Sequence, residues 1–151
     1  SLFDRMGLDV EICPQFEEAE VDRALYNAFR LRAAFSEVYV DYDDTLLVHG
    51  RINSNLMRFL YQCVNKNIPI SLISKSDSCV RDELKRLKIS EELFRDVVQI
   101  TRQQEKRDFM HPQPGALFID DSFAERKKVR EAFGITTVGT ETVECLIDYR
   151  Q

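Results

Sequence analysis

The sequence has no cysteine pair at the spacing of a zinc site or a disulfide framework. The four cysteines, Cys13, Cys63, Cys79 and Cys145, are scattered, and none belongs to a CxxC or CxxH pattern. Cys63 falls on the apolar face of a predicted helix, where a buried thiol is the expected state. Because a chain without a disulfide framework suits a reducing compartment, we expect the protein in the cytoplasm.

Long apolar runs and an excess of positive charge are also missing. No stretch approaches the ~18 apolar residues of a membrane span, and no signal-peptide pattern opens the chain. We therefore expect no membrane partner. The formal net charge of -5 argues against a nucleic-acid-binding surface, because phosphate backbones select basic faces.

What remains is the composition of a globular protein, with 44% apolar and 31% charged residues. The 151 residues suffice for one complete domain and are too few for two ordinary ones. We predict an N-terminal helical extension over residues 1–35 and a catalytic domain over residues 36–151. In the extension, residues 16–32 carry an apolar stripe at helical spacing, with acidic residues first and basic residues last. The chain begins with Ser1, and whether it is a fragment of a longer protein stays open.

From residue 36 onward, short apolar strands alternate with amphipathic helices. We expect strands at 38–40, 69–73, 97–100, 116–119 and 135–138. We expect helices at 54–64, 77–87, 91–94, 104–110, 122–133 and around 143–147. Five strands with helices between them predict a three-layer α/β sandwich around a mostly parallel, five-stranded, Rossmann-like sheet.

Local signals indicate where these helices begin and end, and which faces they bury. We expect Ser54 to cap the first helix, Ser122 and Glu125 to form a capping box, and Gly134 to end the helix that the box begins. The side chains expected to face the core are Leu56, Phe59, Leu60, Cys63 and Val64 in the first helix, Val80, Leu84 and Leu87 in the second, and Val129, Ala132 and Phe133 in the helix at 122–133.

Polar residues follow three of the predicted strands at the point where each apolar run stops. Asp41 and Asp43 follow the first strand, Ser74 the second, and Asp120 and Asp121 the fourth. In an open parallel sheet, ligands bind beyond the carboxyl ends of the strands, so we expect these side chains to meet. Carboxylates gathered there repel one another unless a cation compensates their charge. The pattern therefore predicts a cation-dependent site at this edge of the sheet.

This ordered set of residues resembles the four motifs of the haloacid dehalogenase (HAD) superfamily. The matching residues are Asp41-x-Asp43-x-Thr45, then Ser74, a lysine, and Asp120-Asp121. The resemblance covers residues 36–149, and the tract 118–126 is also similar to HAD domains attached to bacterial ATP-grasp, carbamoyl-phosphate-synthase-like proteins. It implies a phosphatase that depends on Mg²⁺ and hydrolyses a phosphomonoester through an aspartyl-phosphate.

By this resemblance, Asp41 is the nucleophile, and Asp43 is the general acid and then the general base. Mg²⁺ is held by hard oxygen ligands from Asp41, Asp121, the carbonyl of Asp43, and Asp120 directly or through water. Ser74 hydrogen-bonds a phosphoryl oxygen.

The phosphoryl group also needs a positive charge beside it, and the choice of lysine stays open at this point. Lys106 is preferred because it precedes the fourth strand, where the family carries its third motif. Lys75, next to Ser74, is the competitor, and Lys85 lies within a helix, where it is less suited to reach the site. Arg51 is our candidate for contact with an anionic substrate.

Two residues near the first motif have a simpler explanation beside a catalytic one. Asp44 is expected to be a turn residue, because Asp favours turns by bonding its own backbone. Thr45 either contacts phosphate or only holds that turn.

Three residues outside the first motif also have a simpler explanation. Ser74 could cap the helix that follows it, and Lys106 could belong to a solvated charged stretch. The capping box with Ser122 is sufficient reason for Glu125.

The intervals between the motifs leave no room for a cap domain. About thirty residues separate Thr45 from Ser74, and a similar number separates Ser74 from Lys106. The loop at 48–53 could form only a small flap. We therefore expect an open site that hydrolyses its phosphorylated substrate, covered by a fused upstream domain or by another copy in a homo-oligomer.

Two other classes of function compete with this interpretation. One is a non-catalytic HAD-like docking or regulatory domain of a larger multidomain protein, although the intact Asp41 and Asp43 pair argues against it. The other is a two-component receiver domain, which carries its phosphorylated aspartate on a later strand. The substrate and the oligomeric state stay open.

Overall fold

The computed structural model describes residues 35–150. The expected helix at 16–32 lies outside the described residues, as do Cys13 and the rest of the proposed N-terminal extension before Phe35. The helical elements are α3 (Ser54–Asn65), α4 (Val80–Arg86), α5 (Phe123–Phe133), α6 (Val143–Leu146) and three short 3₁₀ helices, η1 (Glu91–Leu93), η2 (Lys106–Phe109) and η3 (Thr140–Thr142). None of the helices in this part of the chain is both long and apolar enough to cross a membrane.

Five parallel strands form the central sheet, as the sequence predicts. They are β1 (Val38–Val40), β4 (Ile70–Lys75), β5 (Asp96–Ile100), β6 (Leu117–Ile119) and β7 (Thr136–Val138). They lie in the order β5-β4-β1-β6-β7. Numbered along the chain, this order is 3-2-1-4-5, so its direction reverses between β1 and β6. Ligands of open α/β sheets bind at this kind of reversal, beyond the carboxyl ends of the strands.

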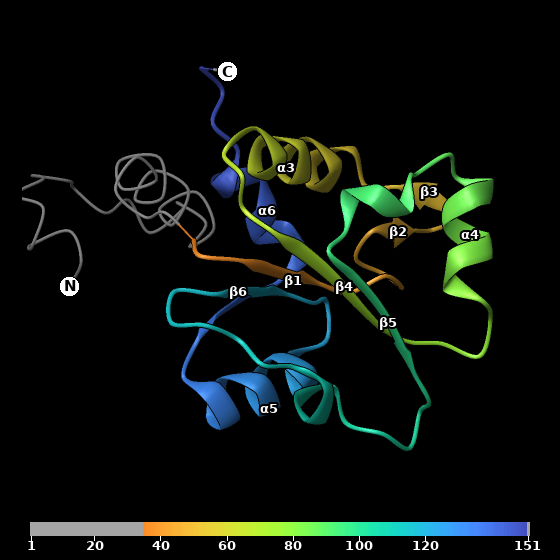
Figure 1. Ribbon diagram of the computed structural model, residues 1–151, viewed down its shortest axis with the longest axis vertical. Coiled ribbons are helices and arrows are strands. Elements are labelled where there is room, and N and C mark those ends of the chain that lie inside the picture. The colour runs from red at the N-terminus through yellow and green to blue at the C-terminus, as the bar shows by residue number, and fades with distance from the viewer. Residues whose placement is uncertain (1–34, 151) are drawn as a thin grey trace, which may run out of the picture.

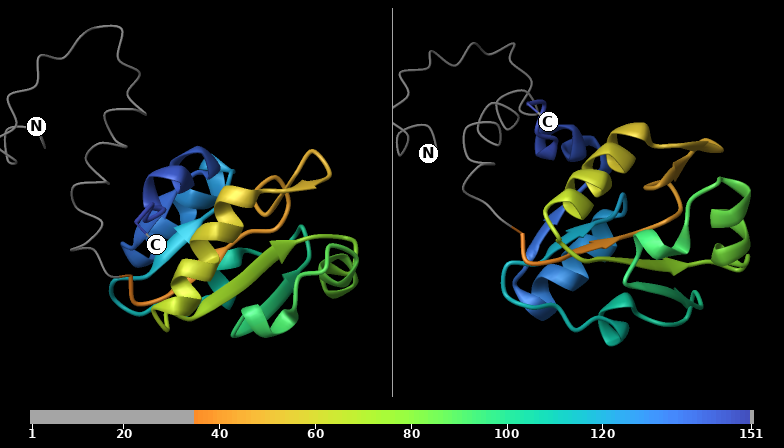
Figure 2. Two further views of the ribbon diagram at one scale, coloured as in Figure 1. Left: turned by 90° about the horizontal axis from the view of Figure 1, so that it is seen from above. Right: turned by 45° about the horizontal axis from the view of Figure 1, so that its top comes forward.

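Helices cover both faces of the sheet (Figures 1 and 2). Successive residues of a strand point to opposite faces. The even positions Val38 and Val40 accordingly pack in a core with α3, α4 and α6, while Tyr39 packs on the other face with Val129 of α5. This arrangement confirms the α/β sandwich with a Rossmann-like parallel sheet.

A two-stranded antiparallel hairpin, β2 (Leu47–Val48) with β3 (Arg51–Ile52), follows β1. His49 and Gly50 form its turn with positive φ angles of 51° and 74°. It is the small flap expected for this loop, and with α3 it fills the interval between β1 and β4.

The caps and inner faces of the helices differ in places from the prediction. Asn53, and not Ser54, caps α3, since the Asn53 side chain accepts a hydrogen bond from the Leu56 N–H at 3.2 Å. Both residue types cap helices well, so composition alone does not decide between neighbours. Val64 is 45% exposed and Ala132 is exposed, because each lies on the flank of its helix. Cys63 is buried as expected, and burial raises its pKa to about 12.

The second predicted helix starts three residues late, and the strand before it is longer than predicted. Helix α4 begins at Val80, since the Ser76 hydroxyl accepts from the Ser78 N–H at 3.2 Å and holds a local turn instead. Strand β4 runs on to Lys75, so Ser74 is its penultimate residue.

We predict that Asn53→Ala lowers the free energy of unfolding by about 1 kcal/mol, because it removes the cap of α3. It also removes the hydrogen bond from Asn53 Nδ2 to the Thr45 carbonyl. Urea unfolding measures the change. Ser54→Ala is the matched control and should stay within about 0.5 kcal/mol of the parent. A larger loss in Ser54→Ala than in Asn53→Ala would contradict the assignment of the cap.

Candidate active site

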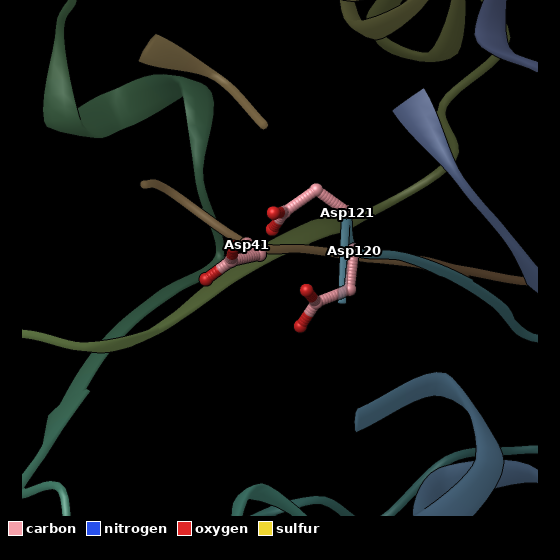
Figure 3. Close-up of side chains that lie close together, drawn as sticks. All are labelled: Asp41, Asp120 and Asp121. Atoms are coloured by element: carbon pink, nitrogen blue, oxygen red, sulfur yellow. The ribbon is translucent and has the colours of Figure 1, made fainter. Parts of the chain in front are cut away.

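Three aspartates meet where the strand order reverses. Asp41 directly follows β1, and Asp120 and Asp121 directly follow β6. The ladder continues one step past the strands, since the Asp41 N–H donates to the Ile119 carbonyl at 2.9 Å. One carboxylate oxygen from each aspartate lies within 4.8 Å of the others, and Figure 3 shows the three side chains close together at the ends of the two strands. We call Asp41, Asp120 and Asp121 the acid cluster.

Lys106 joins the two buried members of this cluster. It is the first residue of η2, its side chain is 3% exposed, and its Nζ lies 2.7 Å from Asp41 Oδ1 and 2.6 Å from Asp120 Oδ2. The ammonium group is also 5.8 Å from the centre of the Phe118 ring. The sequence favoured Lys106 over the other lysines, and the structure places it in direct contact with the expected nucleophile.

One lysine does not balance the negative charge of the acid cluster. Burial raises the pKa of Asp41 to about 7, although the Lys106 ammonium opposes this shift. Burial raises the pKa of Asp120 as well. For Lys106, burial alone would lower the pKa, but the two carboxylates together raise it. Lys106 therefore pairs with two buried carboxylates, and the exposed Asp121 adds a third carboxylate beside them, which is an environment that favours a further positive charge.

Thr45 ties the ends of β1 and β6 together. Its buried hydroxyl lies 3.1 Å from Asp41 Oδ2 and 3.3 Å from Asp121 Oδ1, so its one proton can serve either carboxylate. The same oxygen accepts a hydrogen bond from the Asp121 N–H at 3.1 Å. The turn and the carboxylates are thus held by one side chain.

Ser74 is buried at the same edge of the sheet, near the end of β4, the neighbour of β1. Its hydroxyl has no hydrogen-bond partner among residues 35–150. The alternative that Ser74 caps the following helix is wrong, because α4 begins at Val80, whose N–H donates to the Gln99 side chain at 3.0 Å. A buried hydroxyl without a partner is destabilising unless a ligand satisfies it.

Asp43 and Asp44 are not members of the acid cluster. Asp43 is exposed, and its pKa is raised, first by partial desolvation and then by the neighbouring charge of Asp44. The side chain of Asp43 is not part of the acid cluster. Asp44 is exposed and has a φ of 54°, which fits the expected turn residue.

Lys75 points to other acids. Its Nζ lies 2.7 Å from Glu125 Oε1 and 3.9 Å from Glu105 Oε2. The sequence predicts a capping box of Ser122 and Glu125, but only half of it forms. The Ser122 hydroxyl accepts a hydrogen bond from the Glu125 N–H, whereas the Glu125 carboxylate pairs with Lys75. Because these partners are far apart in the sequence, no local signal indicates the pair.

Two further basic residues that the sequence considers are exposed. Arg51 is exposed in β3 of the hairpin, and Lys85 is exposed in α4.

No sequence pattern indicates Arg126, whose guanidinium donates hydrogen bonds to the backbone carbonyls of Asp120 and Asp121.

Oxygen donors are the ligands that hard divalent cations such as Mg²⁺ select. The acid cluster offers carboxylate oxygens from two strands within one small volume, with excess negative charge. Its residues therefore fit a divalent cation.

We predict that Asp41→Asn stabilises the metal-free protein at pH 8. The pKa of Asp41 is raised above its unfolded value, so its contribution to stability is present below about pH 4 and is lost as the pH rises through about 7. The neutral amide of the variant does not ionise, so it is not destabilised as the pH rises. In EDTA, the melting temperature of the variant should be ~4 °C above that of the parent at pH 8, and the difference should shrink at pH 5. Asp44→Asn is the control and should show no such pH dependence. A variant less stable than the parent at pH 8 would refute the charge imbalance.

Comparison with known proteins adds only a likeness of fold. No protein family model and no curated protein matches this chain. The fold is similar to the crystal structure, at 1.44 Å resolution, of an uncharacterized protein from Corynebacterium glutamicum ATCC 13032 Kitasato, with a TM-score of 0.50 and 18% sequence identity. The match covers 70% of this chain and 85% of that one.

Proposed function

We propose that the protein is a capless, HAD-type phosphatase that depends on Mg²⁺ and hydrolyses a phosphomonoester through Asp41. The observation that carries this proposal is the acid cluster bridged by the buried Lys106. The cluster lies at the carboxyl edge of a parallel sheet, where the strand order reverses. A purely structural role does not require a third carboxylate, Asp121, beside the two that the lysine already pairs with.

In the first half of the proposed reaction, a carboxylate oxygen of Asp41 attacks phosphorus in line with the leaving oxygen and forms an aspartyl-phosphate. Lys106 supports this step, because its ammonium favours the ionised form of Asp41 against the effect of burial. Asp43 protonates the leaving oxygen. Its raised pKa suits an acid that must hold its proton until that moment.

In the second half, Asp43 accepts a proton from the attacking water, and the phosphate leaves Asp41. Asp41, Asp120 and Asp121, together with the Asp43 carbonyl, would hold Mg²⁺. When bound, this ion neutralises phosphoryl oxygens and so lowers the repulsion between the phosphate and the carboxylates.

Ser74 supports phosphoryl binding independently of the acid cluster. Its hydroxyl is buried and has no hydrogen-bond partner within residues 35–150. A phosphoryl oxygen would accept this hydrogen bond and remove the desolvation penalty of the hydroxyl. Lys75 is the less favoured phosphate ligand, since its ammonium is paired with Glu125.

The elements between the motifs favour an open site. The interval between Thr45 and Ser74 contains the hairpin and α3, and the interval between Ser74 and Lys106 contains α4, η1 and β5. With no larger insertion to exclude water, transfer to water is the expected outcome. A fused upstream domain or a second copy would then cover the site, and Arg51 on the hairpin would contact an anionic substrate.

Of the competing functions, the receiver domain fits less well. The flavodoxin-like strand order found in receivers is 2-1-3-4-5, whereas this sheet has the order 3-2-1-4-5. The non-catalytic docking domain stays as the alternative, and activity measurements separate it from the phosphatase.

We predict that the protein releases phosphate from p-nitrophenyl phosphate in the presence of Mg²⁺ and that Asp41→Asn lowers the rate at least about 10³-fold, because the nucleophile is lost. Asp44→Asn, three positions on and outside the acid cluster, is the matched control and should lose far less activity, because it removes only one of the influences on the pKa of Asp43. Soaking with Mg²⁺ and beryllium fluoride should give density joined to Asp41. A folded parent with no turnover on a broad phosphomonoester panel would favour the docking domain.

We predict opposite effects of Ser74→Ala on stability and on phosphate binding. The substitution removes an unpaired buried hydroxyl, so the unfolding free energy should stay level or rise by about 1 kcal/mol. Inhibition by vanadate, a mimic of the phosphoryl group, should weaken about tenfold, because a hydrogen bond to a charged group is lost. Loss of stability with unchanged vanadate inhibition would show that Ser74 is structural.

A further inference from the structure

Two adjacent residues of a strand point to opposite faces, yet the carboxylates of Asp120 and Asp121 reach the same cluster. This is possible because β6 ends at Ile119 and the chain turns before α5 begins at Phe123. The geometry of this turn, residues 120–122, therefore decides whether both carboxylates can serve one cation.

The backbone N–H groups of the turn are held by side-chain oxygens. The Asp121 N–H donates to Thr45 Oγ1 at 3.1 Å, and the Ser122 N–H donates to Asp120 Oδ1 at 2.9 Å. Asp120 thus uses one oxygen for the turn and the other for Lys106.

The carbonyl groups of the turn are held by one cation. Nη1 of Arg126 donates to the Asp120 carbonyl at 2.8 Å and to the Asp121 carbonyl at 2.9 Å. Two neighbouring carbonyls that converge on one point repel each other, and a guanidinium is suited to offset this because its charge and donors are fixed in one plane. Arg126 Cζ also lies 5.8 Å from the centre of the Phe123 ring, a side chain that is 64% exposed.

We propose that Arg126 is a positioning residue for the cation site: it holds the 120–122 turn in the conformation that presents Asp120 and Asp121 to the same ion. This inference rests on the proposed function, since it assumes that the acid cluster binds a divalent cation. Arg126 acts through the backbone and contacts neither the cation nor the phosphoryl group.

Positioning and simple charge predict opposite changes in metal affinity. A nearby positive charge repels a bound cation, so an Arg126 that acted only through its charge would weaken metal binding, and its removal would tighten it. If Arg126 holds the turn, its removal lets the two carboxylates separate and weakens binding.

The test measures Mn²⁺ affinity of the full chain by the electron paramagnetic resonance signal of free Mn²⁺, for the parent, Arg126→Met, Arg126→Lys and Arg130→Met. Arg126→Met and Arg126→Lys should each bind Mn²⁺ about tenfold more weakly, because the lysine keeps the charge but its shorter side chain does not carry a donor to the position of Nη1. Arg130, exposed one turn further along α5, is the matched control and should bind as the parent does. Melting in EDTA reports the fold of each variant, and the lysine variant serves if the methionine variant does not fold.

Three results would overturn the proposal. Tighter binding in Arg126→Met with unchanged binding in Arg126→Lys would mean that Arg126 acts through charge alone. Unchanged Mn²⁺ affinity with a lower melting temperature would mean that Arg126 only stabilises the fold, and the proposed phosphatase would stand without this inference. A parent that binds no Mn²⁺ would remove the cation site itself, and both proposals with it.

Discussion

The structure depends on the buried lysine that bridges two aspartates. Lys106 contacts Asp41 after β1 and Asp120 after β6, so it joins two strands of the sheet and the 3₁₀ helix that carries it. Replacing a buried ion pair by apolar side chains of similar volume is often neutral or stabilising. Burial of these charges is therefore poorly explained by stability alone. Loss of Lys106, by contrast, would leave two buried carboxylates without a partner, which destabilises by several kcal/mol.

The contact between Lys106 and Asp41 also bears on whether Asp41 is protonated or ionised near neutral pH. Without a further cation, Asp41 has a pKa of about 7, because burial outweighs the effect of Lys106. A nucleophilic carboxylate must be ionised, so the proposed reaction needs additional positive charge beside it. Lys106 and the proposed Mg²⁺ would both supply the positive charge that keeps Asp41 ionised. The lysine is part of the fold, whereas the ion would bind to it.

The sequence predicts those parts of the fold and site that follow from short patterns. Apolar runs locate the five strands, and the aspartates just beyond two of them must share an edge, since all strands of a parallel sheet end on the same side. Patterns fail where two neighbouring residues are chemically alike, as with Asn53 and Ser54 at the start of α3. They also fail for single contacts across long separations: Lys75 meets Glu125 fifty positions away, which no spacing rule anticipates.

The arrangement divides the site into an inner and an outer half. Asp41, Thr45 and Ser74 are buried, whereas Asp43 and Asp121 are exposed at the rim. Electrostatic interactions strengthen where water is excluded, so the inner half is where charge on a phosphoryl group would be stabilised most. In the proposed reaction the leaving group and the attacking water exchange with solvent, and the exposed Asp43 would be accessible to both. The raised pKa of Asp43 is consistent with this division, because a rim carboxylate that is only partly desolvated can still exchange its proton with water.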